Sequence, residues 1–199
     1  MDDKRFEKQL AFLREIDKAK SIFRNTLLLD ASRRENDAEH SWHMAICAML
    51  LYEYMDEPIN DMGRLLKMIM LHDVVEIYAG DTFAYGSHQE ISSQKERELA
   101  AADRIFSLLP EEQASDFRSL WDEFEASATP EAKCARAVDT FMPVYHNYMT
   151  NGQKWLELGA TKEKVFARCN WIKQGSDELY DFICGIIDDA VEKGFLPEH

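Results

Sequence analysis

Residues 68–77 read MIMLHDVVEI, an apolar run that contains an adjacent imidazole and carboxylate, His72 and Asp73. Burying both groups among leucine, isoleucine and valine side chains costs free energy unless a partner compensates their polarity. A divalent metal ion is a partner that uses both groups at once. Glu76 follows His72 by one helical turn, so on a helix these two side chains share a face. Glu76 is then placed beside such a metal, where it can act as a general base on metal-bound water.

Length and composition are typical of one globular domain. The 199 residues suffice for a sizeable core without requiring a second one, so we expect a single domain over residues 1–199. Hydrophobic residues make up 46% and charged residues 30%, as in ordinary soluble proteins. No apolar run approaches the ~18 residues needed to span a membrane. Residues 1–5 are charged and lack the apolar segment of a signal peptide. We therefore expect a cytoplasmic protein with no membrane partner.

The formal net charge of −14 excludes one class of partner. Binding to a nucleic-acid polymer rests on a basic surface, which this chain does not have. The charge does not exclude a small phosphate ester, because a metal ion and one or two arginines can reverse the field within a cleft. The four cysteines are widely spaced and form no CxxC pair, so we expect reduced, mostly buried thiols.

Helical periodicity dominates the chain. Apolar residues recur at spacings of three and four, Asp37 is a candidate N-cap, and Pro143 is expected to kink a helix near Asp139. Residues 21–37 break the pattern, and no alternating strand is evident. The sequence predicts an all-α fold, an irregular bundle of about seven or eight helices. The expected helices are 3–19, 38–55, 61–78, 92–109, 111–126, 130–149, 161–174 and 176–193.

A second histidine for the metal lies at the start of the expected helix 38–55. His40 follows an unusually polar stretch, which favours a functional role, but His43 can point to the same side and the spacing does not choose between them. Glu39 has two interpretations. It can orient His40 as a hydrogen-bond acceptor, or it can simply stabilise the N-terminus of the helix.

A second carboxylate, Asp139, lies in the apolar stretch ARAVDTFM, residues 135–142. A cation would compensate its burial, and the guanidinium of Arg136, three residues earlier, is an alternative to a metal. Two imidazoles and two carboxylates form a mixed nitrogen and oxygen ligand set with room for water. Such a set suits one divalent ion, which can be Mn, Co, Fe, Ni, Zn or Mg. Its members are His40, His72, Asp73 and Asp139.

The order of these residues resembles the H…HD…D signature of the HD-domain metal-dependent phosphohydrolases. More narrowly, the chain is similar to the bacterial 5′-deoxynucleotidases and their eukaryotic relatives. The residues concerned are Arg33 seven positions before His40, the HDxxE motif at 72–76 and Gly80-Asp81. The resemblance covers residues 24–139 and implies an HD-domain helical bundle. Residues 150–199 match no motif, and the helices within 154–193 are expected to belong to the same domain.

The resemblance also implies roles for individual residues. His40, His72, Asp73 and Asp139 would hold the metal, and Glu76 would position or deprotonate the attacking water. Asp81 would contact that water or the sugar. Arg24 would bind the phosphate with Arg33 as a second support, since planar guanidinium groups offer paired donors to phosphate oxygens. A homodimer is implied by the resemblance alone.

Two departures from the bacterial enzymes affect the expected substrate. Asn25 stands where those enzymes have an aromatic residue after the phosphate-binding arginine, and the spacing from Arg24 to His40 differs by about one residue. Both changes fall where nucleotide and sugar are selected. The metal assignment is therefore better supported than the identity of the substrate.

The expected function is a metal-dependent phosphomonoesterase that releases phosphate from a nucleoside 5′-monophosphate, with a deoxynucleotide as one option. One alternative is a phosphodiesterase or nucleoside-triphosphate hydrolase of the same superfamily, although few extra histidines are placed for a second metal. The other is a non-catalytic regulator that binds a metal or nucleotide. Glu76 together with Asp81 favours an enzyme, because a pure binding module needs neither.

Overall fold

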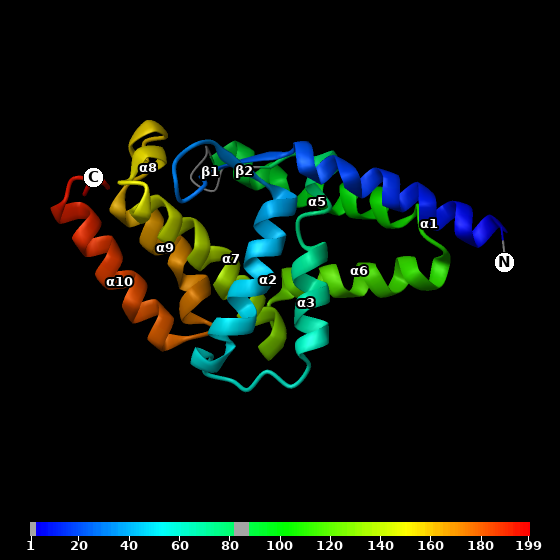
Figure 1. Cartoon of the computed structure of the whole chain (residues 1–199). Coiled ribbons are helices and arrows are strands. Elements are labelled where there is room, and N and C mark those ends of the chain that lie inside the picture. Colours follow the sequence, from blue (N-terminus) through cyan, green and yellow to red (C-terminus); the bar gives the residue numbers. More distant parts are fainter. Residues whose placement is uncertain (1–2, 82–87) are drawn as a thin grey trace.

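The computed structural model describes residues 3–81 and 88–199, and the side chains of 88–93 are outside the description (Figure 1). The described elements are, in chain order, α1 (Asp3–Ile16), the 3-10 helix η1 (Asp17–Ser21), β1 (Phe23–Leu27), β2 (Arg34–Asn36), α2 (Asp37–Leu51), the 3-10 helix η2 (Tyr52–Tyr54), α3 (Met62–Leu71), α4 (Glu76–Ala79), α5 (His88–Phe106), α6 (Glu111–Ala126), α7 (Pro130–Met149), α8 (Gln153–Glu157), α9 (Lys162–Lys173) and α10 (Asp177–Glu192).

The expected all-α class is confirmed. Among the described elements, every α-helix except α4 and α8 has ten or more residues. The expectation of no strand is wrong in one place, because β1 and β2 form a small antiparallel sheet. Phe23 pairs with Asn36 and Leu27 with Arg34, with an irregularity between these pairs. A strand of three residues is too short to show alternation in a sequence, and so this sheet could not be read from residues 21–37.

The start of α2 corrects the expected cap. Asn36, not Asp37, is the N-cap, since its Oδ1 accepts the Glu39 N–H at 2.9 Å. The Asn36 N–H donates in turn to Oε2 of Glu39 at 3.2 Å, which completes a capping box. Asp37 becomes the first helical residue and is buried.

The HD pair does not lie inside a helix. Instead of one helix to residue 78, α3 begins after its N-cap Asp61, whose Oδ1 accepts the Arg64 N–H, and ends at Leu71. Residues 72–75 form tight turns, in which the Val74 N–H donates to Leu71 O at 3.3 Å. The sequence pattern could not show this break, because the residues on both sides keep the apolar spacing of a helix. Gly80, with φ 76°, then ends α4 and turns the chain toward Asp81.

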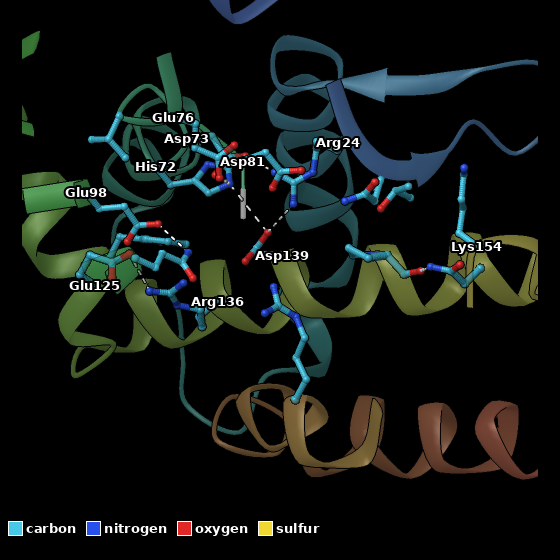
Figure 2. Close-up of a pocket in the computed structure, with 18 of the residues that line it drawn as sticks. Arg24, His72, Asp73, Glu76, Asp81, Glu98, Glu125, Arg136, Asp139 and Lys154 are labelled. Atoms are coloured by element: carbon cyan, nitrogen blue, oxygen red, sulfur yellow. Dashed lines mark hydrogen bonds and ion pairs between the residues drawn. The ribbon is translucent and has the colours of Figure 1, made fainter. Parts of the chain in front are cut away.

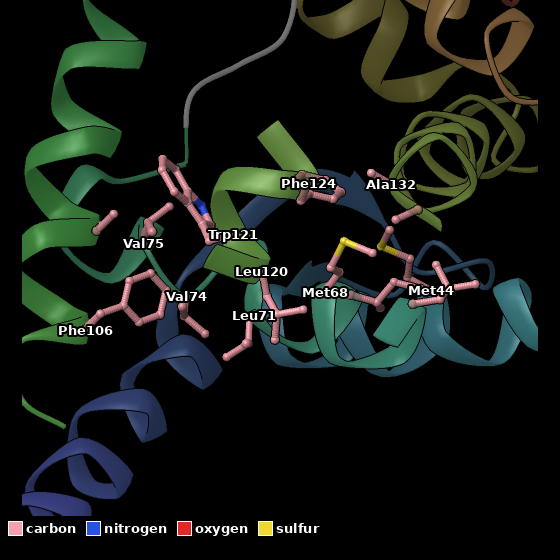
Figure 3. Packing of buried hydrophobic residues seen from close by; sticks show 14 of the residues in the cluster. Met44, Met68, Leu71, Val74, Val75, Phe106, Leu120, Trp121, Phe124 and Ala132 are labelled. Carbon is pink, nitrogen blue, oxygen red and sulfur yellow. The ribbon is translucent and has the colours of Figure 1, made fainter. Parts of the chain in front are cut away.

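Two apolar clusters form the core, and α7 belongs to both. The first cluster joins α3, the turn after it, α5, α6 and the first part of α7; ten of its members are labelled in Figure 3. The second joins the end of α7 to α8, α9 and α10, around Trp155, Ile172 and Ile183. The helix α7 continues through Pro143 to Met149. It therefore connects the two halves of the molecule.

Two sequence expectations about solubility and redox state can be compared with this fold. All four cysteines are free thiols, and Cys134 and Cys169 are fully buried. None of the helices in the described ranges combines the length and the apolar character that crossing a bilayer requires.

Candidate active site

The structure brings the four expected metal ligands together from three distant parts of the chain. His40 lies on α2, His72 and Asp73 lie in the turn after α3, and Asp139 lies on α7. Nε2 of His40 is 3.1 Å from Oδ1 of Asp139, and Nε2 of His72 is 3.8 Å from the same oxygen. Nε2 of His72 is also 3.1 Å from Oδ1 of Asp73. All four side chains are buried. Figure 2 shows His72, Asp73 and Asp139 converging.

The hydrogen bonding of His72 fits a cation. Its Nδ1 lies 2.7 Å from the carbonyl oxygen of Ile69. A carbonyl only accepts, so Nδ1 carries the proton and Nε2 presents a lone pair. That Nε2 is buried and has no hydrogen-bond partner among the described residues. A lone pair that faces the carboxylates of Asp73 and Asp139 requires a positive charge between them, which a divalent metal supplies.

Glu35, not Glu39, lies behind His40. Oε1 of Glu35 is 3.3 Å from Nδ1 of His40, and both side chains are almost completely buried. Burial and Arg24 act to lower the pKa of His40, but Asp139 and Glu35 outweigh them and raise it to about 9. A buried imidazole that retains a proton shows that the surrounding carboxylates favour positive charge at this point. A carboxylate behind a histidine is also the usual partner that orients a metal ligand.

Arg24, from β1, reaches the same carboxylates. Its Nη1 is 2.5 Å from Oδ2 of Asp73, and its Nη2 is 3.8 Å from Oδ1 of Asp139. Burial acts to lower the pKa of Arg24, but the carboxylates of Asp73, Glu76 and Asp139 raise it well above its ordinary value. The guanidinium is therefore charged and lies directly beside the candidate metal ligands.

Glu76 and Asp81 both line a cavity beside these ligands (Figure 2). Burial raises the pKa of Glu76 well above its ordinary value, and the nearby Asp73 adds to this. Burial likewise raises the pKa of Asp81. A carboxyl group with a raised pKa can exchange a proton with water near neutral pH, which is the property a general base requires.

Asp37 is a member of this cluster that sequence reasoning missed. One oxygen from each of Asp37, Asp73 and Glu76 lies within 4.8 Å of the others. Burial and the proximity of Asp73 raise the pKa of Asp37 to about 8. A signal existed in the sequence, since Asp37 lies three residues before His40 and therefore on the same face of α2.

The two open alternatives of the sequence have clear outcomes. Arg136 does not neutralise Asp139, because its Nη2 donates to Glu125 at 2.8 Å and its guanidinium lies 4.0 Å from the ring centroid of Phe124. His43 is not part of the ligand group; its ring stacks on Trp42.

The structure does not bring Arg33 into the cavity. Arg33 is half exposed, and its Nη1 and Nη2 donate to the two carboxylate oxygens of Glu39 at 2.8 and 2.7 Å. Glu39 in turn caps α2 through Asn36. In this structure Arg33 acts on the start of α2, whereas the resemblance placed it on the phosphate.

Replacing Arg33 with alanine is therefore expected to leave the KM for a phosphate ester unchanged. Stability should fall only slightly, because exposed ion pairs contribute little to folding. Steady-state kinetics and urea unfolding measure the two effects. A large rise in KM with normal stability would instead show that Arg33 contacts the substrate.

The cavity has a volume of about 210 Å³ and is lined by residues from both halves of the molecule. Its walls include three aromatic side chains, Trp121, Phe124 and Trp155. Sequence reasoning missed the contribution of α8 and α9, because residues 150–199 match no motif. The charged residues in the lining are Arg24, Asp73, Glu76, Asp81, Glu98, Glu125, Arg136, Asp139, Lys154 and Arg168.

Comparison with known proteins agrees with this geometry. The sequence model of the HD domain matches residues 16–180, most of the chain. The chain belongs to the HD-domain family. This HD-domain protein is 45% identical to a predicted metal-dependent phosphohydrolase from Magnetospirillum magnetotacticum, whose crystal structure matches with a TM-score of 0.91 over 98% of this chain and 96% of that one. An HD-domain phosphohydrolase of Listeria innocua, 15% identical with a TM-score of 0.66 over 94% and 92% of the two chains, shares the fold.

Curated relatives of this HD-domain protein are named 5′-deoxynucleotidases. It is 29% identical to 5′-deoxynucleotidase HDDC2 of Homo sapiens over 131 residues, which are 65% of this chain and 62% of the human protein. It is 27% identical to the 5′-deoxynucleotidase of Yersinia pestis over 164 residues, 78% of this chain and 83% of the relative. The match to the human protein thus spans less than two thirds of its length.

Proposed function

We propose that this protein is a metal-dependent phosphomonoesterase that releases phosphate from a nucleoside 5′-monophosphate or its deoxy form. The observation that carries the proposal is the convergence of His40, His72, Asp73 and Asp139 beside a cavity that Glu76 also lines. The names of the relatives support a nucleotide as the substrate.

The four buried side chains would hold one divalent ion, which can be Mn, Co, Fe, Ni, Zn or Mg. When bound, such an ion supplies Lewis acidity to the phosphoryl group and lowers the pKa of water. The carboxylate of Glu76 takes a proton from the attacking water, and Asp81 orients that water or the sugar. Arg24 neutralises negative charge on the phosphoryl oxygens.

Incubation of the purified protein with Mn²⁺ or Co²⁺ and a panel of nucleotides tests this proposal. We expect orthophosphate from nucleoside monophosphates, measured by a colorimetric phosphate assay. Pyrophosphate or tripolyphosphate as the product would favour a triphosphate hydrolase instead. Release of no phosphate by protein that demonstrably holds the metal would favour a non-catalytic binding protein.

Two further expectations stay predictions. The homodimer rests on resemblance, although α2 leaves Trp42 and Leu50 among the exposed apolar side chains that a second copy could cover. The cytoplasmic location rests on the sequence.

A further inference from the structure

Three of the four cationic side chains that line the cavity already have partners. Arg24 is paired with the carboxylates of the candidate metal site. Arg136 donates to Glu125 at 2.8 Å, and Lys154 donates to Glu157 at 2.6 Å. Each of these charges is thus largely compensated by the protein itself.

Arg168 is the fourth cation, and its situation differs. It lies on α9, which packs along α7, the helix that carries Asp139 (Figure 1). Its side chain is half-buried and lines the cavity together with Asp81 and Asp139. Within residues 3–81 and 94–199, no hydrogen bond, ion pair or ring contact joins Arg168 to another residue.

A half-buried guanidinium without a partner loses hydration and receives little in return. The cavity offers it a use, because a guanidinium presents paired donors that match the oxygens of a phosphate. The metal-site residues and Arg24 gather at one part of this cavity, and Arg168 adds a separate donor from α9. An oxyanion in the cavity would therefore meet an uncommitted cation there.

We propose that Arg168 binds the phosphoryl group of the substrate and is the second arginine of the site. This inference rests on the proposed function. It gives Arg168 the role that the resemblance assigned to Arg33, which is occupied with Glu39 on the surface. The C-terminal helices then take part in substrate recognition directly, through a residue outside the HD motifs.

The proposal also specifies a substrate class. A phosphomonoester has three terminal oxygens and carries close to two negative charges at neutral pH, since its second pKa is about 6. A phosphodiester has two such oxygens and one charge. A second arginine adds donors for the extra oxygen and charge, so Arg168 selects terminal phosphate groups over internal ones.

The test compares Arg168→Gln and Arg168→Lys with a matched control, Lys164→Gln. Lys164 lies on the same helix, is exposed and is absent from the cavity lining. We expect Arg168→Gln to lower kcat/KM for a nucleoside monophosphate by about tenfold to a hundredfold, the range for loss of a hydrogen bond to a charged group. Arg168→Lys should fall between this variant and wild type, because lysine retains the charge without the fork.

A model diester, bis(4-nitrophenyl) phosphate, separates recognition of the terminal phosphate from a general loss of activity. Its hydrolysis should change much less in Arg168→Gln than that of the monoester, and Lys164→Gln should leave both unchanged. Thermal unfolding followed by circular dichroism shows whether each variant is folded. Equal losses for monoester and diester in folded Arg168→Gln would overturn the inference, as would unchanged monoester kinetics. Hydrolysis by the wild type leaves the proposed function standing in both cases.

Phosphate binding provides a measurement that does not need turnover. Calorimetric titration of Mn²⁺-loaded protein with inorganic phosphate should give at least about tenfold weaker binding for Arg168→Gln. If the wild type hydrolyses no ester, the proposed function fails and this titration alone decides the role of Arg168. Equal affinities, or a wild type that binds no phosphate, would overturn it.

Discussion

Replacing Glu76 with glutamine is expected to lower kcat by about 10²- to 10⁴-fold, the usual contribution of a general base. Glutamine keeps the size of the side chain but accepts no proton from water. The metal content should stay at the wild-type level, because Glu76 lies beside the ligand group formed by His40, His72 and Asp139. Single-turnover kinetics and elemental analysis of the same preparation measure both quantities.

The control for this variant is Glu96→Gln, which removes a carboxylate from an exposed position on α5. It should behave as wild type in both measurements. Unchanged turnover in Glu76→Gln would show that another group accepts the proton. Loss of the metal together with turnover would show that Glu76 is a ligand.

The second large effect is expected for Asp139→Asn. Oδ1 of Asp139 lies within 3.8 Å of both His40 Nε2 and His72 Nε2, so this oxygen is common to the whole ligand group. Metal affinity should fall by more than the tenfold to hundredfold that loss of an outer-shell partner costs. Phosphate release should then drop to background at ordinary metal concentrations.

Equilibrium dialysis with Mn²⁺ measures this loss, and Asp116→Asn is the control, because Asp116 is exposed on α6. Restoration of activity at very high Mn²⁺ would agree with a weakened site. Stoichiometric metal in Asp139→Asn at the wild-type affinity would remove Asp139 from the ligand set and with it the basis of the proposed function.

Much of the fold and of the ligand group could be predicted from the sequence, because both depend on local patterns. The spacing of apolar residues predicts helices, and a histidine or aspartate inside an apolar run indicates a buried partner. His72, Asp73 and Asp139 carry that signal, and the structure brings them together. Asp61 as the cap of α3 is another local feature that the sequence showed.

The remaining features depend on tertiary contacts that no local pattern contains. The break at residues 72–75 follows a helical apolar spacing, so only the packed structure reveals it. Glu35 faces His40 because a three-residue strand turns it inward. Arg168 reaches the cavity through the packing of α9 on α7, which its sequence neighbours do not indicate.

The connection of the two apolar clusters through α7 has a consequence for how this enzyme class can diversify. Every residue that would hold the metal precedes residue 140, whereas Lys154 and Arg168 follow it on α8 and α9. Reactivity and selectivity are thus encoded in successive parts of one gene. Exchange of residues 150–199 between relatives should therefore transfer ester preference and leave the hydrolytic machinery of the recipient in place.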